Sequence, residues 1–379
     1  MSLDVRSALE YLAARNGSDL HLKVGSPPMI RVDGDLEPIP ESDQVTPPDT
    51  EAAVAEILHD APRLEELRRE GEIDFGFSVP GLARFRVNAF QQRGSLSIVC
   101  RRIPHGVTTI EELGLPGVVR DIAEEPRGIV IVTGTTGSGK STTLAGMVDH
   151  INESAARHIV TIEDPIEFLH ADKRSIINQR EIGTDTGSFD RALRRVLRQD
   201  PDVILIGEMR DEETVATALS AAETGHLVFS TLHTADAAEA INRIVDFFPP
   251  HQQGQVRSML ASTLRAVISQ RLVPMANGGR VAALEVLRAT GRVRDAIIDV
   301  GGVGSLTQII AEGSYYGMQT FDQALFEFVR SERITREAAL AACSSPQDFK
   351  LLLAAEGQTH APLPGAAAFE PATASHPNA

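Results

Sequence analysis

The stretch 129–144, IVIVTGTTGSGKSTTL, restricts the fold of this chain more than any other part of its sequence. Its first residues are apolar, as in a buried strand, and a glycine-rich turn separates them from a helix predicted over 141–152. The turn fits the pattern G-x-x-x-x-G-K-[ST] through Gly134, Gly139 and Lys140-Ser141. A glycine-rich turn between strand and helix predicts a phosphate-binding loop, because backbone N–H groups and the helix N-terminus favour an anion there.

Each polar group of this loop has a predicted role. Lys140 supplies a positive charge to the β and γ phosphates, and the hydroxyl of Ser141 ligates Mg²⁺. ATP and Mg²⁺ are therefore the expected ligands. The predicted nucleotide-binding residues of the loop are Gly134, Thr135, Thr136, Gly137, Ser138, Gly139, Lys140, Ser141 and Thr142.

Composition and charge narrow the class of protein. The 379 residues are 42% hydrophobic and 23% charged, as in folded globular chains, and their number suggests two domains. A net charge of −16 argues against a protein whose main task is binding nucleic acid. Two distant cysteines, Cys100 and Cys343, indicate neither a disulfide framework nor a cysteine zinc site. No targeting or membrane-spanning segment is evident, so we expect a cytoplasmic protein that reaches membranes only through partners.

The first domain is predicted over 1–105 as a small α+β unit. Helices are expected over 3–15 and 50–70, and a tight hairpin turn at Asp33-Gly34. Three alternating segments from residue 72 to residue 103 predict an antiparallel meander. The alternation places Arg84 and Arg86 on one face and Phe85 and Val87 on the other, with Arg101 opposite Cys100.

After a Pro- and Gly-containing linker over 106–116, strands alternate with helices, which predicts a parallel sheet covered by helices. This α/β domain is expected over 117–356. Its strands are predicted over 129–133, 158–163, 203–206, 226–232 and 280–287. Its main helices are predicted over 141–152, 188–199, 212–223 and 252–271. The Ala- and Pro-rich segment 357–379 has no apolar period and predicts a disordered tail.

Two carboxylates at strand ends are candidates for positioning or deprotonating the attacking water. Glu208 follows the apolar strand VILI, where it would also reach the metal through a water, and Glu163 ends the strand IVTI. Either residue could be the general base, and Glu163 is a second metal candidate. The acidic residues from Asp211 to Glu213 are interpreted only as charges that suit a helix N-terminus.

Further site candidates are histidines and arginines. His226 and His233 bracket the strand HLVFSTLH; His233 would sense the γ-phosphate, and His226 is a weaker nucleotide-binding candidate. The α/β domain offers no obvious arginine finger of its own. Arginines of the small domain could complete the site of a neighbouring subunit, which would require a ring. These predicted catalytic arginines are Arg86, Arg93 and Arg101.

Several segments together resemble the secretion ATPases of type II secretion and type IV pilus systems, most closely the pilus-retraction ATPases. The resemblance covers about residues 1–355 and rests on "GSDLHL" at 17–22, "RFRVN" at 84–88, "GTTGSGKSTTLAGM" at 134–147, "TIEDPIEF" at 161–168, "INQREIG" at 177–183, "DPDVILIGEMRD" at 200–211, "AAETGHLVFSTLHT" at 221–234 and "GMQTFDQAL" at 317–325. The chain lacks the four-cysteine zinc site and the additional N-terminal domains of the extension ATPases, which favours the retraction branch.

The resemblance implies a PAS-like N-terminal domain, a RecA-like ATPase domain and a homohexameric ring. It implies an aspartate box at Glu163, an atypical Walker B ending at Glu208, a histidine box of His226 and His233, and the arginines named above as trans arginines. The expected function is Mg·ATP hydrolysis that powers pilin disassembly and twitching motility, with the inner-membrane platform protein and a paralogous retraction ATPase as candidate partners. Alternatives are a pilus-extension or type II secretion ATPase, a RecA-like nucleic-acid motor and a nucleotide-binding regulator.

Overall fold

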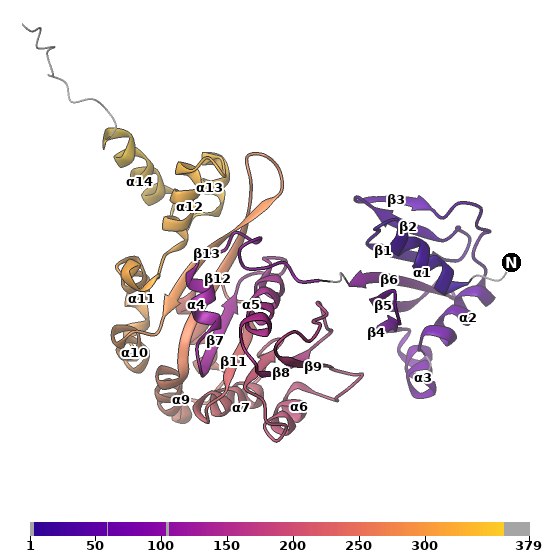
Figure 1. Cartoon of the computed structure of the whole chain (residues 1–379), viewed down its shortest axis with the longest axis horizontal. Coiled ribbons are helices and arrows are strands. Elements are labelled where there is room, and N and C mark those ends of the chain that lie inside the picture. The colour runs from indigo at the N-terminus through magenta and orange to yellow at the C-terminus, as the bar shows by residue number, and fades with distance from the viewer. Residues whose placement is uncertain (1–3, 59, 104–105, 360–379) are drawn as a thin grey trace, which may run out of the picture. The chain divides into compact units, whose positions relative to one another are not determined.

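The computed structural model describes residues 4–58, 60–103 and 106–359 of the chain (Figure 1). These residues form two β-sheets, each with its own helices and buried core. The chain divides into two compact units. The first unit consists of the described residues up to Leu272 together with Val281–Thr320. The second consists of Val273–Arg280 together with the described residues from Phe321 onwards.

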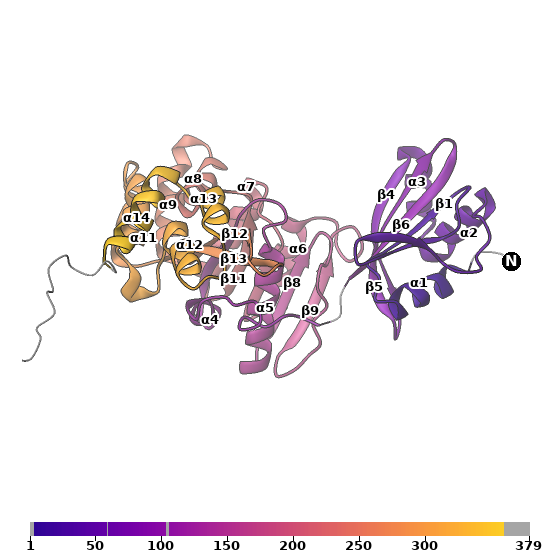
Figure 2. The ribbon, with the colours of Figure 1, turned by 90° about the horizontal axis from the view of Figure 1, so that it is seen from above.

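The first sheet has six strands in the order β3-β2-β1-β6-β5-β4, and all of its neighbouring strands pair in antiparallel fashion. Helices α1, α2 and α3 share a hydrophobic core with this sheet (Figure 2). Its elements are α1 Val5–Ala14, β1 Asp19–Lys23, β2 Met29–Val32, β3 Asp35–Pro38, α2 Pro47–Leu58, α3 Ala61–Glu70, β4 Glu72–Val79, β5 Ala83–Gln92 and β6 Ser95–Ile103.

The structure confirms the hairpin at Asp33-Gly34, whose two residues have φ values of 49° and 97°, and the meander β4-β5-β6. The single helix predicted over 50–70 is wrong, because α2 and α3 are separate helices. Pro62 lies in the first turn of α3, after Asp60 at its N-cap. Proline has no N–H to donate and suits a helix start, so it cannot continue a helix from before.

One face of the meander carries the arginines expected from the alternation. Phe85, Val87 and Cys100 are buried in the core of the first sheet, as predicted. Arg86 on β5 lies directly opposite Arg101 on β6, and both side chains are exposed. Two like charges at opposed positions destabilise a sheet, so the stability of the sheet does not account for this pair.

The second sheet has seven strands in the order β13-β12-β7-β11-β10-β8-β9, of which the six from β12 to β9 pair in parallel. Its helices cover two faces (Figure 1). The elements are α4 Val118–Ala123, β7 Gly128–Thr133, α5 Lys140–Ser154, β8 His158–Glu163, β9 Ile176–Glu181, α6 Phe189–Val196, β10 Val203–Ile206, α7 Glu212–Glu223, β11 Leu227–Leu232, α8 Ala237–Asp246, α9 Pro250–Thr263, β12 Leu264–Pro274, β13 Arg280–Arg288, α10 Gly291–Ile298, η1 Gly302–Ser305, α11 Leu306–Ala311, η2 Ser314–Tyr316, α12 Phe321–Arg330, α13 Arg336–Ala342 and α14 Pro346–Thr359.

Strand β7 lies inside this sheet and is buried along its whole length. Ile129 and Ile131 belong to one hydrophobic core, together with residues of α6 to α9, whereas Val130 and Val132 belong to a second core with residues of α4 and α5. Because successive side chains of a strand point to opposite faces, a strand covered by helices on both sides needs an unbroken apolar run. This requirement explains the sequence of the segment before the phosphate-binding loop.

Three parts of the second sheet differ from the predictions. The helix predicted over 252–271 ends at Thr263, and the remaining residues form β12, which pairs with β7. The prediction missed β9 and α8 altogether. In the predicted linker 106–116, Ile110 and Leu115 are buried in the core that also contains Leu144 of α5, so this segment packs against the α/β domain.

At the C-terminus, α14 extends to Thr359, three residues into the segment predicted as a disordered tail, and the rest of that segment lies outside the described residues. Within the second compact unit, Asp322 of α12 accepts a hydrogen bond of 2.7 Å from the backbone N–H of Ser344.

None of the helices described here is both long and apolar enough to span a membrane.

Glu285 of β13 is a carboxyl group inside the core of the second sheet, 5% exposed. It accepts hydrogen bonds from the backbone N–H of Ala237, the first residue of α8, at 2.9 Å and from the hydroxyl of Ser269 at 3.4 Å. Burial raises the pKa of Glu285 to about 7; the charge of Asp236 acts in the same direction, while the Ala237 N–H, the Arg271 charge and the Ser269 hydroxyl oppose it.

We expect Glu285→Gln to stabilise the protein at alkaline pH. Between the usual carboxyl pKa of 4.5 and about 7, the folded state binds more protons than the unfolded state, so the wild type loses stability as the pH rises through this window. The variant should therefore gain about 1–3 kcal/mol at pH 8 and much less at pH 5. Urea unfolding at both pH values, with the exposed Glu223→Gln as control, measures this. A gain that does not change with pH would contradict the assignment.

Candidate functional site

The phosphate-binding loop begins where β7 ends. Gly134, Gly137 and Gly139 have φ values of 144°, 78° and 90°, which L side chains rarely adopt, and Gly139 is the N-cap residue of α5. The chain thereby turns from a buried strand into the helix that begins at Lys140, as predicted. The N-terminus of a helix carries unpaired N–H groups and a partial positive charge, so this end of α5 suits an anion.

Two of these glycines are also required by space. A Cβ atom on Gly134 would lie 2.5 Å from the carbonyl oxygen of Gln270 and 2.5 Å from the hydroxyl of Ser138. On Gly139 it would lie 2.7 Å from Nε2 of Gln270. Any other residue would push the loop away from β12, which lies beside β7 in the sheet.

Gln270 is a functional candidate that the sequence analysis missed. Its side chain is 3% exposed; Nε2 donates a hydrogen bond of 2.7 Å to the carbonyl of Ser138, and Oε1 accepts one of 2.7 Å from the hydroxyl of Thr143. One carboxamide therefore joins the loop to the first turns of α5. Its sequence carries no clear signal, because the segment LRAVISQRLV at 264–273 mixes apolar and polar residues and most of it was predicted as helix.

The side chain of Lys140 is hydrogen-bonded to the backbone of the phosphate-binding loop. Its ammonium group donates to the carbonyls of Gly134 at 2.8 Å and Thr135 at 3.0 Å. Burial lowers the pKa of Lys140, whereas the negative charges of Glu208 and Glu167 raise it. Both carboxylates therefore act electrostatically on the lysine that would contact the β and γ phosphates.

The loop fits a nucleotide phosphate in a further respect. Ser138 is 4% exposed, and its hydroxyl oxygen has no hydrogen-bond partner among the described residues. The same holds for the hydroxyl of the fully buried Thr133, at the end of β7. Buried polar groups are normally paired, so two unpaired hydroxyls beside a glycine turn point to a polar ligand there. Ser141 and Thr142 follow in the first turn of α5, where the sequence predicted a metal ligand and a phosphate contact.

Glu208 lies two residues after β10, and the structure brings it together with His233, which follows β11. Glu208 Oε1 lies 3.3 Å from Nε2 of His233, and Glu208 Oε2 accepts a hydrogen bond of 2.7 Å from Nε of Arg210. These three side chains line a pocket of about 470 Å³. The strand ends of β10 and β11 thus place a carboxylate and an imidazole at the same edge of the sheet as the loop.

Glu163, the last residue of β8, has a different environment. It accepts hydrogen bonds from the hydroxyl of Thr161 at 2.6 Å, from the side-chain amide of Gln179 at 3.2 Å and from the backbone N–H of Glu167 at 3.4 Å. Burial raises its pKa; these three donors lower it, and the charge of Glu167 adds to the rise. No Lys or Arg pairs with Glu163 among the described residues, whereas Glu208 pairs with Arg210.

His226 does not join this group, which corrects its assignment to nucleotide binding. Its backbone carbonyl accepts a hydrogen bond of 2.9 Å from Gly128, the first residue of β7, and its Nδ1 lies 2.9 Å from the carbonyl of Ala221. It therefore lies at the start of β11, and the loop lies at the other end of the neighbouring strand. Six residues of strand separate these ends by about 20 Å.

The three predicted arginines lie on the first sheet. Arg93 is in the turn between β5 and β6, with a φ of 52°, and is exposed. Nε of Arg101 donates a hydrogen bond of 2.8 Å to the buried Asp19, while Arg86 Nε is 3.9 Å from Asp74. Arg86 is thus the more weakly bound of the opposed pair.

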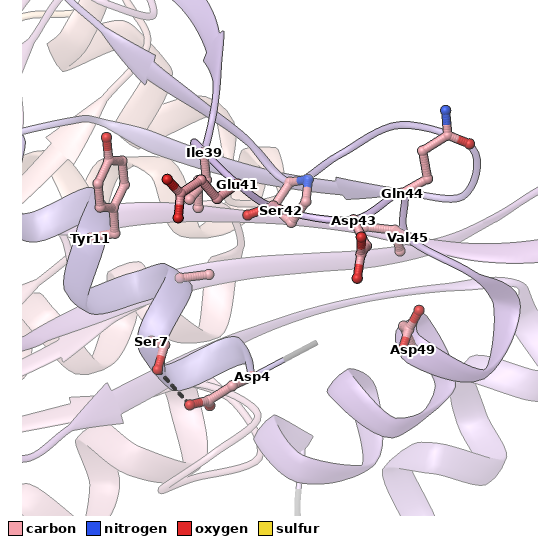
Figure 3. Close-up of a pocket in the computed structure, with 12 residues that line it drawn as sticks. Asp4, Ser7, Tyr11, Ile39, Glu41, Ser42, Asp43, Gln44, Val45 and Asp49 are labelled. Atoms are coloured by element: carbon pink, nitrogen blue, oxygen red, sulfur yellow. Dashed lines mark hydrogen bonds between the residues drawn. The ribbon is translucent and has the colours of Figure 1, made fainter. Parts of the chain in front are cut away.

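A pocket of about 430 Å³ also lies in the first sheet's region, between α1 and the segment after β3 (Figure 3). Four carboxylates line it, from Asp4, Glu41, Asp43 and Asp49. A concentration of negative charge repels phosphate, so this pocket does not compete with the loop as the nucleotide site.

The family of type II/IV secretion system proteins matches this chain over residues 70–316. The chain is 48% identical to the type IV pilus retraction ATPase PilT of Pseudomonas aeruginosa over 351 residues, which are 92% of this chain and 100% of that protein. It is 50% identical to a twitching motility protein of Neisseria gonorrhoeae over 82% of this chain and 83% of that protein.

A solved structure agrees with these relatives. The crystal structure of the pilus retraction motor PilT with bound ADP superposes with a TM-score of 0.84 at 44% identity, covering 92% of this chain and 99% of that one. The likeness therefore extends over both sheets. The chain belongs to the family of type II/IV secretion system proteins, among its PilT-like ATPases.

Proposed function

We propose that this chain is the ATPase motor of type IV pilus retraction, which removes pilins from the pilus base and thereby drives twitching motility. The observation that carries the proposal is the 48% identity to a pilus retraction ATPase along that protein's whole length. The phosphate-binding loop supports it, because each of its glycines and its lysine has the conformation or contacts that phosphate binding needs. A nucleic-acid motor is disfavoured by the net charge of −16.

The nucleotide would be held by the loop residues from Gly134 to Thr142. Lys140 would exchange its bonds to the loop carbonyls for bonds to the β and γ phosphates. The unpaired hydroxyl of Ser138 would gain a partner. Mg²⁺, held by Ser141 and through water by Glu208, would neutralise charge on the phosphate oxygens.

We propose different roles for the two carboxylates, both of which the sequence left as candidate bases. Glu208 accepts a hydrogen bond from Arg210 and lies beside His233, so it suits the side of the site facing the metal. Glu163 is surrounded by neutral donors, and burial raises its pKa, so it is the better proton acceptor near neutral pH. His233, bound to Glu208, would report the γ-phosphate to the end of β11.

The arginines of the first sheet would act on a neighbouring subunit. Arg86 on β5 and Arg101 on β6 are opposed like charges, and both are exposed. Arg93 is also exposed and lies in the turn that connects these two strands. We propose that they reach the phosphates of an adjacent subunit in a homohexameric ring. The ring would lie at the cytoplasmic face of the inner membrane, bound to the pilus platform protein.

We expect Lys140→Ala to abolish ATP turnover, since no other described residue puts a cation inside the loop. Phosphate release by the purified chain measures this, and the exposed Lys23→Ala is the matched control. Hexamers should persist in both variants. Normal turnover in Lys140→Ala would overturn the assignment of the loop.

The same allele tests the function in cells. A deletion strain and a strain with Lys140→Ala at the native locus should both carry excess surface pili and lack twitching motility, whereas Lys23→Ala should behave as the wild type. Bald cells would instead indicate a motor that extends pili or secretes protein.

The pH dependence of kcat should distinguish the roles of Glu163 and Glu208. We expect Glu163→Gln and Glu208→Gln each to lower kcat by about 100-fold or more. Because burial raises the pKa of Glu163, we expect the wild type to lose activity on acidification, and we expect only Glu163→Gln to remove this loss. An acidic limb that persists in Glu163→Gln and disappears in Glu208→Gln would reverse the two roles.

Completion of the site by a second subunit predicts recovery in mixed rings. Lys140→Ala and Arg86→Ala are each expected to be inactive, but mixing them pairs an intact loop with an intact arginine in some interfaces. Arg86 is preferred to Arg101, because removing Arg101 would take from the buried Asp19 the arginine that it pairs with. Turnover measured over a series of mixing ratios should pass through a maximum; a flat series would exclude this arrangement.

A further inference from the structure

A broad pocket of about 840 Å³ lies at the edge of the second sheet opposite to the phosphate-binding loop. Arg127, which lines it, directly precedes β7, whereas Gly134 follows that strand. The six residues between them span about 20 Å. An occupant of this pocket would therefore not compete with nucleotide, and nothing in the proposed ATPase cycle uses it.

Four arginines converge on this pocket from separate segments: Arg127, Arg265 at the start of β12, Arg288 at the end of β13 and Arg294 in α10. Only two carboxylates, Asp121 and Glu125, line it with them. The pocket is thus a positive site on a chain whose net charge is −16.

The inner two arginines are already bound. Glu125 accepts a hydrogen bond of 2.6 Å from Arg288 and lies 3.7 Å from Nε of Arg265, which also donates to the carbonyl of Arg127 at 2.8 Å. Burial lowers the pKa of Arg265, and although Glu125 opposes this, the charges of Arg294 and Arg127 lower it further. The guanidinium groups therefore repel one another, and an added negative charge would relieve that repulsion.

The outer two arginines are available. Arg127 and Arg294 are exposed, and neither guanidinium has a hydrogen bond or ion pair within the described part of the chain. They are the groups that an incoming anion would meet first. Arginine is well suited to this task, because its planar donors bind a carboxylate in two places at once.

Two tyrosines complete the rim. Tyr315 is 91% exposed and Tyr316 54% exposed, and their rings contact edge to face with centroids 5.2 Å apart. A small-molecule site buries most of its ligand, which such exposed rings would not do. Exposed tyrosines beside arginines are instead typical of the centre of a protein–protein interface, where covering each ring removes a large apolar area from water.

We propose that this pocket docks a short acidic segment of a partner protein, whose carboxylates bind Arg127 and Arg294 and whose backbone or apolar side chains cover Tyr315 and Tyr316. The proposal goes beyond the ATPase function and does not depend on it. It assigns the end of the second sheet opposite to the phosphate-binding loop as a surface that a partner protein binds.

The test uses the full chain and a fluorescein-labelled twelve-residue peptide of Glu and Asp with one central Leu, in fluorescence anisotropy at low salt. Arg127→Glu/Arg294→Glu should weaken binding by about tenfold or more. Arg68→Glu/Arg336→Glu changes the net charge equally at exposed positions outside the pocket, and should leave binding within about twofold of the wild type. Tyr315→Ala/Tyr316→Ala should also weaken binding, although it alters no charge.

Basal ATP turnover should be unchanged in all three double variants, which separates docking from folding. Equal weakening by both charge reversals, or no weakening by the pocket variant, would overturn the proposal. Displacement of the peptide by inorganic tripolyphosphate at concentrations below those of unlabelled peptide would also overturn it, because the site would then select phosphate. The binding test does not require that the wild type hydrolyses ATP, so a failure of the proposed ATPase function would not change its outcome.

Discussion

The phosphate-binding loop depends on the contact between Gln270 and the backbone of Ser138. A glycine turn has little conformational preference of its own, so something outside it must select one conformation. The carboxamide of Gln270 does this from β12, and by accepting a bond from Thr143 it joins the loop to α5 as well. The loop is thus arranged for an anion before one arrives, which lowers the ordering cost of binding.

Two carboxylates with different surroundings lie at the edge of the sheet that carries the phosphate-binding loop. Glu208 and Glu163 end strands that are two and three positions from β7 in the sheet. One is paired with Arg210 and His233, and the other lies among neutral donors in a desolvated position. Two carboxylates in such different environments can divide metal binding and proton transfer between them. The parallel order of the strands creates this difference, because it gives each strand end different neighbours.

Much of the fold could be predicted from local patterns. The strand β7, the start of α5, the hairpin at Asp33-Gly34 and the two faces of β5 follow from apolar period and turn residues. The failures occurred where local preference and tertiary contacts disagree. The segment 264–271 resembles the continuation of a helix, but it becomes β12 because β7 offers it an open edge. Strand β9 has few fully buried residues, so its sequence carries little signal.

The sequence by itself determined the phosphate-binding loop, since its glycines and lysine are needed at a fixed spacing whatever surrounds them. It also determined that Glu163, Glu208 and His233 lie where apolar strands end. Only the tertiary structure decided that His233 meets Glu208 while His226 lies at the far edge, and that Gln270 holds the loop. The reason is that pairing between strands distant in sequence sets these neighbours, whereas a local pattern gives only the face on which a side chain lies.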